Sequence, residues 1–195
     1  MNKLHVDDLS IGELSQSKYD IALFSCGYEE RCIDVATRLN KDNIDNVIVL
    51  AFDQHKEDTV RIDSLSYFSK SWTGFKLLEI SQREISEIQK ALSEIINKVN
   101  VRELKILIDY TSMSRAWYAA ILNYLVNFCE LKVTVDLIYA TAVYKNLDLN
   151  VELGELRIIP GCEGISLTKR HNAAIFMLGF DRYGPQRLYN LLNPN

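Results

Sequence analysis

Short apolar segments alternate with longer amphipathic ones, and this alternation restricts the possible folds more than any other feature. Between the apolar segments, apolar residues recur every three or four positions, as on one face of a helix. Strands that alternate with helices are typical of parallel sheets, whose two faces are buried by the connecting helices. The sequence therefore predicts an α/β fold, a Rossmann-like three-layer sandwich with a mainly parallel sheet. The expected strands are residues 19–25, 46–53, 74–80, 104–110 and 132–141.

The connecting segments are expected to form helices. The clearest period belongs to residues 81–99, where apolar residues recur from Ile85 to Val99 at three- and four-residue spacing. Ser81 and Glu84 match a capping box at the start of this helix. Five strands joined by crossovers predict the sheet order 3-2-1-4-5. The other helices are expected at residues 29–39, 55–69 and 113–128.

The chain after residue 141 has a less regular pattern. Residues 155–160 and 172–180 resemble strands, whereas residues 184–192 open with Gly-Pro, which favours a closing helix. We expect one Rossmann-like domain over residues 1–195, with its core at 19–141 and a C-terminal extension at 142–195.

Charge and composition disfavour several classes of protein. Lysine and arginine total 22 against 26 acidic residues, and the formal charge of -4 provides no basic field for duplex nucleic acid. The four cysteines and three histidines show no metal-ligand spacing, so no metal or other cofactor is expected. No apolar run approaches the roughly 18 residues that a membrane span needs. Free thiols and a polar start predict a cytoplasmic protein with no membrane partner.

Two polar loops follow the first and fourth predicted strands. In open α/β sheets, ligands bind beyond the carboxyl ends of the strands, where the strand order reverses. In the order 3-2-1-4-5 that position lies between these two loops. They read SCGYEERC at residues 25–32 and DYTSMSR at residues 109–115.

The first loop carries three candidate ligand contacts. Ser25 ends the strand, and Gly27 permits a tight turn or a close backbone approach. Tyr28 offers an aromatic face with a hydroxyl group.

The second loop adds three more contacts at a predicted helix start. Thr111 or Ser112 can cap this helix, whose free N–H groups and dipole favour an anion. Arg115 adds a forked cation, so the two loops together suggest a phosphate site. In the alternative interpretation, Thr111 and Ser112 are only helix caps, and Arg115 pairs with Glu29, Glu30 or Asp109.

Three acidic residues in the loops are candidate catalytic groups. Asp109 ends an apolar strand, where a carboxylate must be hydrogen-bonded, ion-paired or functional. Glu29 and Glu30 fall in the first turn of a predicted helix, where acidic residues are also favoured by the dipole alone. The known fingerprints GxGxxG, GxxxxGK(S/T) and GxSxG are absent, which disfavours the common dinucleotide, P-loop and serine-hydrolase sites.

The loop with Asp109, Thr111 and Arg115 resembles the fourth-strand loop of CARF (CRISPR-associated Rossmann fold) ligand-binding domains. Ser112 and Met113 stand where that family carries two glycines. Over residues 19–141, the resemblance implies a Rossmann-like domain that senses cyclic oligonucleotides or slowly cleaves them without a metal. It also implies a homodimer.

Three functions compete at this point. The leading hypothesis is a binding protein for a small nucleotide-like ligand, such as a cyclic oligonucleotide, in an antiviral or stress-signalling pathway. The second is an enzyme that cleaves an N-glycosidic bond in a nucleoside or NAD-like substrate, with Glu29, Glu30 and Asp109 as its carboxylates. The third is a non-catalytic accessory subunit of a defence complex. The assembly is expected to be a homodimer or part of a complex.

Overall fold

The chain divides into two units, which are described separately. They are Met1–Ala142 and Val143–Asn195. A computed structural model describes residues 10–54, 56–81, 84–141, 158–159 and 184–192. In the second unit, helix α6 (Gly184–Leu192) confirms the closing helix, whereas the described residues 158–159 lie in no strand. The remainder of the strand predicted at 155–160, and all of 172–180, lie outside the described residues. A single domain over the whole chain stays a prediction.

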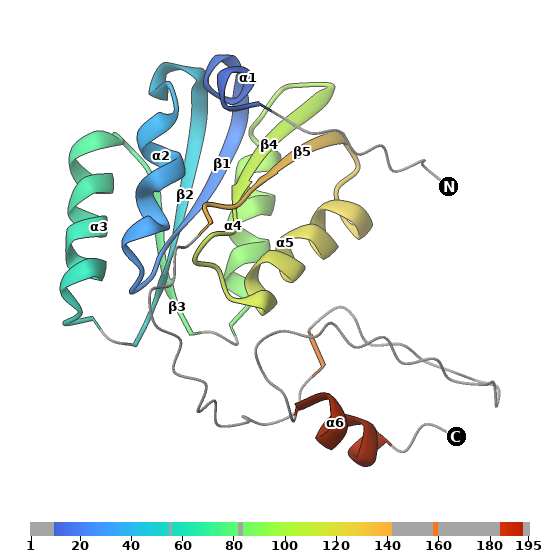
Figure 1. Cartoon of the computed structure of the whole chain (residues 1–195). Coiled ribbons are helices and arrows are strands. Elements are labelled where there is room, and N and C mark those ends of the chain that lie inside the picture. Colours follow the sequence, from blue (N-terminus) through green and yellow to red (C-terminus); the bar gives the residue numbers. More distant parts are fainter. Residues whose placement is uncertain (1–9, 55, 82–83, 142–157, 160–183, 193–195) are drawn as a thin grey trace. The chain divides into compact units, whose positions relative to one another are not determined.

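The first unit contains a five-stranded sheet in which every neighbouring pair is parallel (Figure 1). Its order is β3-β2-β1-β4-β5, which confirms the predicted topology. The predicted strands agree with the observed ones to within three residues at either end. The strands are β1 (Tyr19–Cys26), β2 (Ile44–Phe52), β3 (Lys76–Ile80), β4 (Glu103–Asp109) and β5 (Lys132–Ile138).

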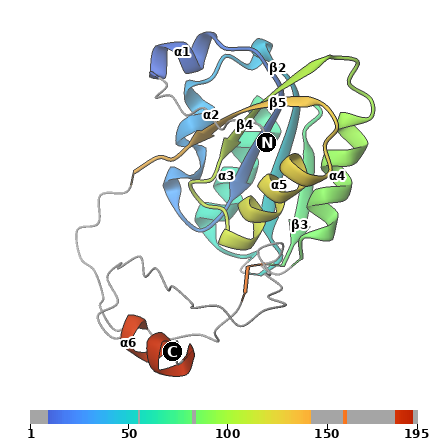
Figure 2. The same ribbon diagram turned by 90° about the vertical axis from the view of Figure 1, so that its right-hand side faces the viewer.

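Helices cover both faces of the sheet and complete the three-layer sandwich (Figure 2). Residues of α2 and α3 join one apolar cluster on the sheet, and residues of α4 and α5 join the other. The helices are α1 (Ile11–Gln16), α2 (Asp34–Arg38), α3 (Thr59–Ser71), α4 (Ser86–Ile96) and α5 (Arg115–Asn127), with short 3₁₀ helices η1 (Glu30–Ile33) and η2 (Lys41–Asn43).

The central strand β1 is buried on both sides because its successive side chains enter opposite apolar clusters. Ile21 and Leu23 pack toward α4 and α5, whereas Ala22 and Phe24 pack toward α2 and α3. All four are fully buried, which accounts for the unbroken apolar run in the sequence. Polar side chains near this strand are therefore restricted to its ends.

Several helices begin later than predicted, because local caps decide where the first turn forms. The segment predicted at 29–39 starts as 3₁₀ helix η1 before it continues as α2. Helix α3 starts at Thr59, since the side chain of Asp58 accepts a hydrogen bond from the N–H of Arg61 (3.1 Å).

The start of α4 corrects another prediction, and α1 is a helix for which no prediction was made. The hydroxyl of Ser81 accepts the N–H of Glu84 (3.1 Å), but this is a local turn, and α4 begins only at Ser86. Helix α1 was not predicted, although Ser10 and Glu13 form a complete capping box at its start. The serine-x-x-glutamate spacing was the available signal.

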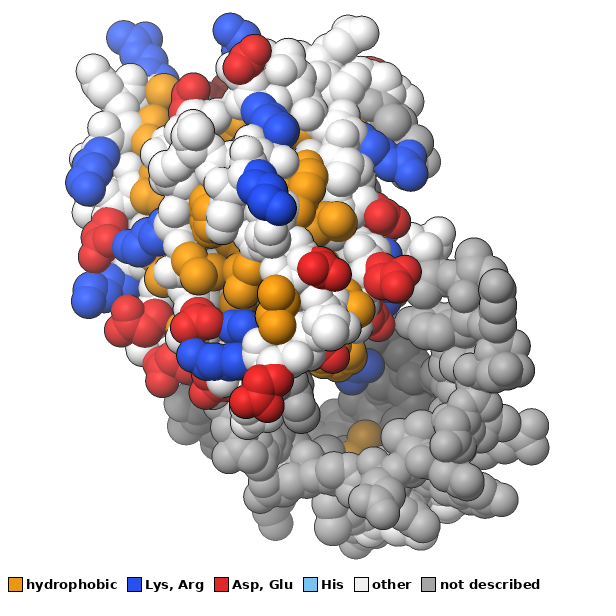
Figure 3. Space-filling model, turned by 90° about the vertical axis from the view of Figure 1, so that its left-hand side faces the viewer, with side chains coloured by type: hydrophobic (Ala, Val, Ile, Leu, Met, Phe, Trp, Pro, Cys, Tyr) orange, Lys and Arg blue, Asp and Glu red, His pale blue; other side chains and the backbone are white. Residues whose placement is uncertain are grey.

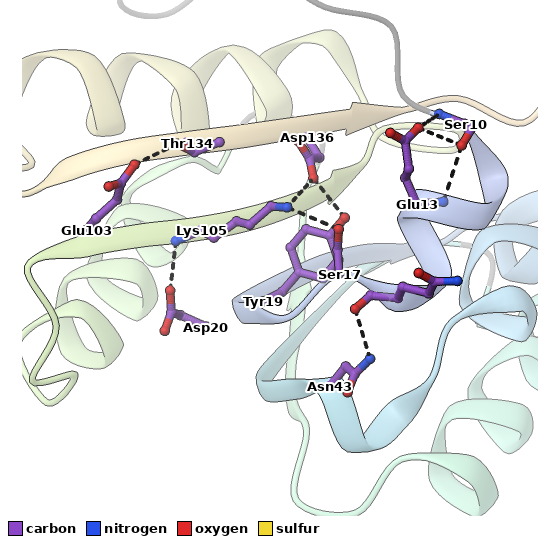
Figure 4. Close-up of polar contacts among 11 residues, drawn as sticks. Ser10, Glu13, Ser17, Tyr19, Asp20, Asn43, Glu103, Lys105, Thr134 and Asp136 are labelled. Atoms are coloured by element: carbon purple, nitrogen blue, oxygen red, sulfur yellow. Dashed lines mark hydrogen bonds and ion pairs between the residues drawn. The ribbon is translucent and has the colours of Figure 1, made fainter.

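A polar network links β1, β4 and β5 at the amino-terminal half of the sheet (Figure 4). The hydroxyl of Tyr19 donates to Asp136 (2.8 Å), and the Lys105 ammonium lies 3.4 Å from the same carboxylate. The Lys105 ammonium also stands 5.0 Å from the centre of the Tyr19 ring and donates to Ser17 (3.1 Å). Burial and the neighbouring carboxylate raise the pKa of Tyr19 far above its ordinary value, so the phenol stays a hydrogen-bond donor.

We expect Tyr19→Phe to lower the free energy of unfolding by about 1 kcal/mol, because it removes one hydrogen bond to a charged acceptor that Lys105 still neutralises. Urea unfolding at neutral pH measures this loss. Tyr28→Phe is the matched control, since Tyr28 is 64% exposed and its substitution should change stability by much less. Equal losses in the two variants would contradict a structural role for the Tyr19 hydroxyl.

Candidate functional site

The loops after β1 and β4 contact each other at the carboxyl edge of the sheet. A β-carbon placed on Gly27 would lie 3.3 Å from the Cβ of Ser112 and 3.8 Å from the ring of Phe52, which ends β2. The first distance is tighter than an ordinary side-chain contact, so glycine permits the observed approach. The structure thus brings two of the predicted ligand contacts, Gly27 and Ser112, directly together.

A row of aromatic rings runs beside this contact. The Tyr28 ring lies 6.3 Å from that of Phe52, and the Phe52 ring stacks on Trp117 of α5 at 4.3 Å. Trp117 is fully buried, and its indole N–H donates to the carbonyl of Ser81 (3.0 Å). Trp117 is therefore part of the core, whereas the exposed Tyr28 presents its ring to solvent.

The helix cap at α5 differs from the prediction. Ser114 is the N-cap, and its side chain accepts the N–H of Trp117 (3.2 Å). Thr111 and Ser112 lie in a turn before the helix, closed by the Met113 N–H on the carbonyl of Tyr110 (3.2 Å). Because this turn separates them from the helix, the interpretation of Thr111 or Ser112 as the cap is wrong.

The hydroxyls of Thr111 and Ser112 are both removed from solvent, but only one is hydrogen-bonded. Thr111 Oγ1 donates to Asp109 (2.5 Å) and accepts the N–H of Ala140 (2.9 Å), so it joins β4 to the segment after β5. Ser112 Oγ is buried without a hydrogen-bond partner in the described part of the chain. A buried hydroxyl of this kind has hydrogen-bonding capacity that the fold does not use.

Arg115 is the first residue of α5, and its side chain is exposed. The alternative in which it pairs with Glu29, Glu30 or Asp109 is wrong, since none of these contacts is present among the described residues. The carboxylate of Glu29 instead binds Arg31, at 2.9 Å from Nε and 2.7 Å from a terminal nitrogen. Arg115 therefore remains available to an external anion.

Arg31 fixes the first loop against the end of β5. Its guanidinium donates to the carbonyl of Ala140 (2.6 Å) and stands 4.9 Å from the centre of the Tyr139 ring. Glu29 is thus committed to an ion pair, and Glu30, which opens η1, is exposed. No contact within the described ranges joins Glu29 or Glu30 to Asp109.

Asp109 is the most deeply buried of the candidate carboxylates, with 1% of its surface exposed. One oxygen accepts both the N–H (3.1 Å) and the hydroxyl of Thr111, while Oδ2 is buried without a partner among described residues. Burial raises the pKa of Asp109 to about 6, against the lowering effect of the two Thr111 bonds. Near neutral pH this group can therefore exchange a proton.

Two buried thiols on the α2–α3 side of the sheet escaped the sequence-based site prediction. Cys26 ends β1 and Cys32 lies on η1; each has at most 1% of its surface exposed. The Cys32 thiol donates a hydrogen bond to the hydroxyl of Ser64 on α3, and the two atoms are 3.1 Å apart. The helical spacing of Cys32 with Val35 indicated burial, but no sequence signal indicated this contact.

Ser25, the remaining predicted contact, lies at the end of β1 with 1% of its surface exposed. Its side chain belongs to the interior, so it supports the loop rather than forming an accessible wall of the site. A separate cavity of about 300 Å³ lies at the opposite edge, near the amino ends of β2 and β3. Its lining includes both basic Lys76 and acidic Asp45, so it does not favour one sign of ligand charge.

Comparisons with known proteins do not identify the site. No protein-family model matches the chain, and no curated protein matches it. Among the described residues, no three histidine, cysteine, aspartate or glutamate side chains are grouped as metal ligands. No helix in those same ranges is long and apolar enough to cross a membrane. Any functional conclusion therefore depends on the geometry of the two loops.

The raised pKa of Asp109 predicts a specific pH dependence. Its folded pKa of about 6 exceeds the ordinary value of 3.8, so the folded state binds this proton more tightly than the unfolded state. The associated stability is present at low pH and is lost as pH rises through about 6. Relative to Asp109→Asn, the wild type should lose about 1 kcal/mol of unfolding free energy between pH 5 and pH 7.5. Urea unfolding of both proteins at the two pH values measures the difference, and a pH-independent difference would show that Asp109 is ionised throughout.

The contact between the loops predicts a non-additive pair of substitutions. Gly27→Ala places a methyl group against Ser112 and should lower the free energy of unfolding by about 1–3 kcal/mol. Ser112→Gly removes the Cβ that this methyl meets, so adding it to Gly27→Ala should recover part of the loss. A double-mutant cycle by chemical unfolding measures the coupling. Strictly additive effects would mean that the two loops do not constrain each other.

Proposed function

We propose that the protein binds a small phosphorylated, nucleotide-like ligand at the carboxyl edge of the sheet, between β1 and β4. The observation that carries this proposal is the contact of Gly27 with Ser112 where the strand order reverses, beside the exposed Arg115. Arg115 makes no ion pair in the described part of the chain. An arginine at a helix start, next to a reversal of strand order, suits a phosphate group.

Each part of such a ligand has a counterpart in the loops. The Arg115 fork and the positive end of the α5 dipole suit the phosphate. The exposed ring of Tyr28 suits stacking with a base. Ser112 Oγ, which has no partner among the described residues, suits a hydrogen bond with a ribose hydroxyl or with water that accompanies it.

The charge distribution supports a small ligand rather than a long polyanion. On the face that contains α3, acidic and basic side chains are interspersed around apolar ones (Figure 3). Neither this mixed face nor the formal charge of -4 favours binding of a long polyanion. The resemblance of residues 109–115 to CARF domains supports cyclic oligonucleotides as one ligand within the class, a role in antiviral or stress signalling, and a homodimer.

The glycosidase alternative has weaker support. It needs several carboxylates to converge on one substrate carbon, but Glu29 is bound to Arg31 and Glu30 is exposed on η1. Asp109 has a buried oxygen without a partner among the described residues, but only 1% of its surface is exposed to a substrate.

We expect Arg115→Gln to weaken binding of a phosphorylated ligand about tenfold or more, since a hydrogen-bonded charge pair contributes roughly 1.5–3 kcal/mol. Equilibrium dialysis with AMP, ATP and a cyclic tetra-adenylate, with adenosine as the unphosphorylated reference, measures this change. Arg102→Gln is the matched control, because Arg102 is also exposed and precedes β4 at the opposite end of that strand.

The control variant should bind as the wild type does, and adenosine should bind more weakly than the phosphorylated probes. If none of the three phosphorylated probes binds the wild type, or if Arg115→Gln and Arg102→Gln bind equally well, the proposed site is wrong.

A further inference from the structure

A cavity of about 300 Å³ lies at the amino edge of the sheet, opposite the two loops of the candidate site. Residues of η2, the start of β2, the turn between α3 and β3 and the end of α4 line it. This volume is at the lower end of the range for small-molecule sites, which is roughly 300–1,000 Å³. The cavity therefore has the size for one small molecule.

Charged side chains of both signs line this cavity, and some of them have no partner of the opposite sign. Three lysines and three acidic residues are among the lining residues. The ammonium of Lys76 lies 2.5 Å from the carboxylate of Glu94, so these two charges neutralise each other. Asp42, Asp45 and Lys98 are exposed and form no ion pair with any described residue. Charges of both signs are therefore available to a molecule that enters the cavity.

The unpaired charges lie on different elements. Asp42 belongs to η2 and Asp45 to the start of β2, whereas Lys98 follows the end of α4. An ion with a single charge could pair with only one sign of these groups, whereas a zwitterion can pair with both. The carboxyl end of α3 also borders the cavity through Ser71, and the negative end of its dipole favours an ammonium group. The surroundings thus suit a ligand that carries both an ammonium and an anionic group.

Trp72, the residue after α3, supplies an aromatic wall and an unused hydrogen-bond donor. It lines the cavity with 5% of its surface exposed, and its indole N–H has no hydrogen-bond partner among the described residues. A buried N–H without an acceptor is uncommon, and a carboxylate or a water molecule is the kind of group that satisfies it. The ammonium of Lys41 stands 5.9 Å from the centre of the same ring, which keeps a further cation at this wall. The wall beside Trp72 therefore suits the anionic end of a ligand.

We propose that this cavity binds a small zwitterion with the chemistry of a free α-amino acid. Lys41 and Lys98 contact its carboxylate group, and Asp42 and Asp45 contact its ammonium group. The unpaired charges of both signs that line one cavity, beside an unsatisfied indole N–H, carry this assignment. The site lies at the opposite edge of the sheet from the proposed nucleotide site, and it does not depend on that proposal.

Equilibrium dialysis of the full chain with each of the common L-amino acids tests the proposal. We expect saturable binding of at least one of them. The best-binding amino acid is then compared with its N-acetyl derivative, which lacks the ammonium charge, and with its amide, which lacks the carboxylate. Each derivative should bind about fivefold more weakly, because each leaves the charges of one sign in the cavity unpaired.

Exposed residues at the cavity permit matched substitutions that leave the apolar core intact. Lys98→Gln and Asp45→Asn should each weaken binding of this amino acid about fivefold. Lys90→Gln on α4 and Asp63→Asn on α3 are the matched controls, since both residues are exposed and neither lines the cavity. The control variants should bind the amino acid as the wild type does.

Tryptophan emission locates the bound amino acid. The chain has two tryptophans, Trp72 at the cavity and Trp117 in the opposite apolar cluster. Binding should change the emission of the wild type, and Trp72→Phe should remove that change.

Three results would each overturn the proposal. They are the absence of saturable binding for every amino acid, a derivative that binds as tightly as its parent, and wild-type binding by both Lys98→Gln and Asp45→Asn. None of these measurements uses a nucleotide, so their failure is distinct from a failure of the phosphorylated probes to bind at the other edge of the sheet.

Discussion

Burial of β1 on both faces is the constraint on which the rest of the structure depends. Its side chains enter two separate apolar clusters, one with α2 and α3 and the other with α4 and α5. An unpaired polar group in the middle of this strand would lose hydration without compensation. Polar side chains therefore gather at the two ends of the sheet. Tyr19, Lys105 and Asp136 lie toward the amino end, and the two loops of the candidate site lie at the carboxyl end.

Strand alternation divides the carboxyl end into two neighbourhoods with different chemistry. Asp109 has the same parity in β4 as Leu107 and faces α2, where burial, Asp34 and Arg31 influence its pKa and where its charge raises the pKa of Cys32. Across the edge, Gly27 and Ser112 contact each other beside the exposed Arg115. One end of the sheet thus combines an accessible cation with a buried group of titratable side chains, and such groups are typical of functional sites.

The sheet was predictable because a strand that is buried on both faces needs a short, unbroken apolar run. Residues 19–25 and 104–110 are such runs. Helix starts were less predictable, since several hydroxyl residues near one helix compete to cap it. Ser114 caps α5 because residues 111 and 112 are used in a turn, which the sequence pattern does not encode. The partners of individual side chains were equally unpredictable. Glu29 binds Arg31 at a separation of two residues, and Cys32 of η1 binds Ser64 of α3, 32 residues later in the chain.

Gly27 lies between the two neighbourhoods, and this makes the first loop sensitive to substitution at this residue. On one side its missing side chain allows Ser112 to approach, and on the other its backbone N–H helps to lower the pKa of Cys32. The negative charge of Asp109 opposes ionisation of Cys32, so the protonation of one buried group affects the other. Gly27 therefore lies between the contact of the two loops and the buried titratable side chains.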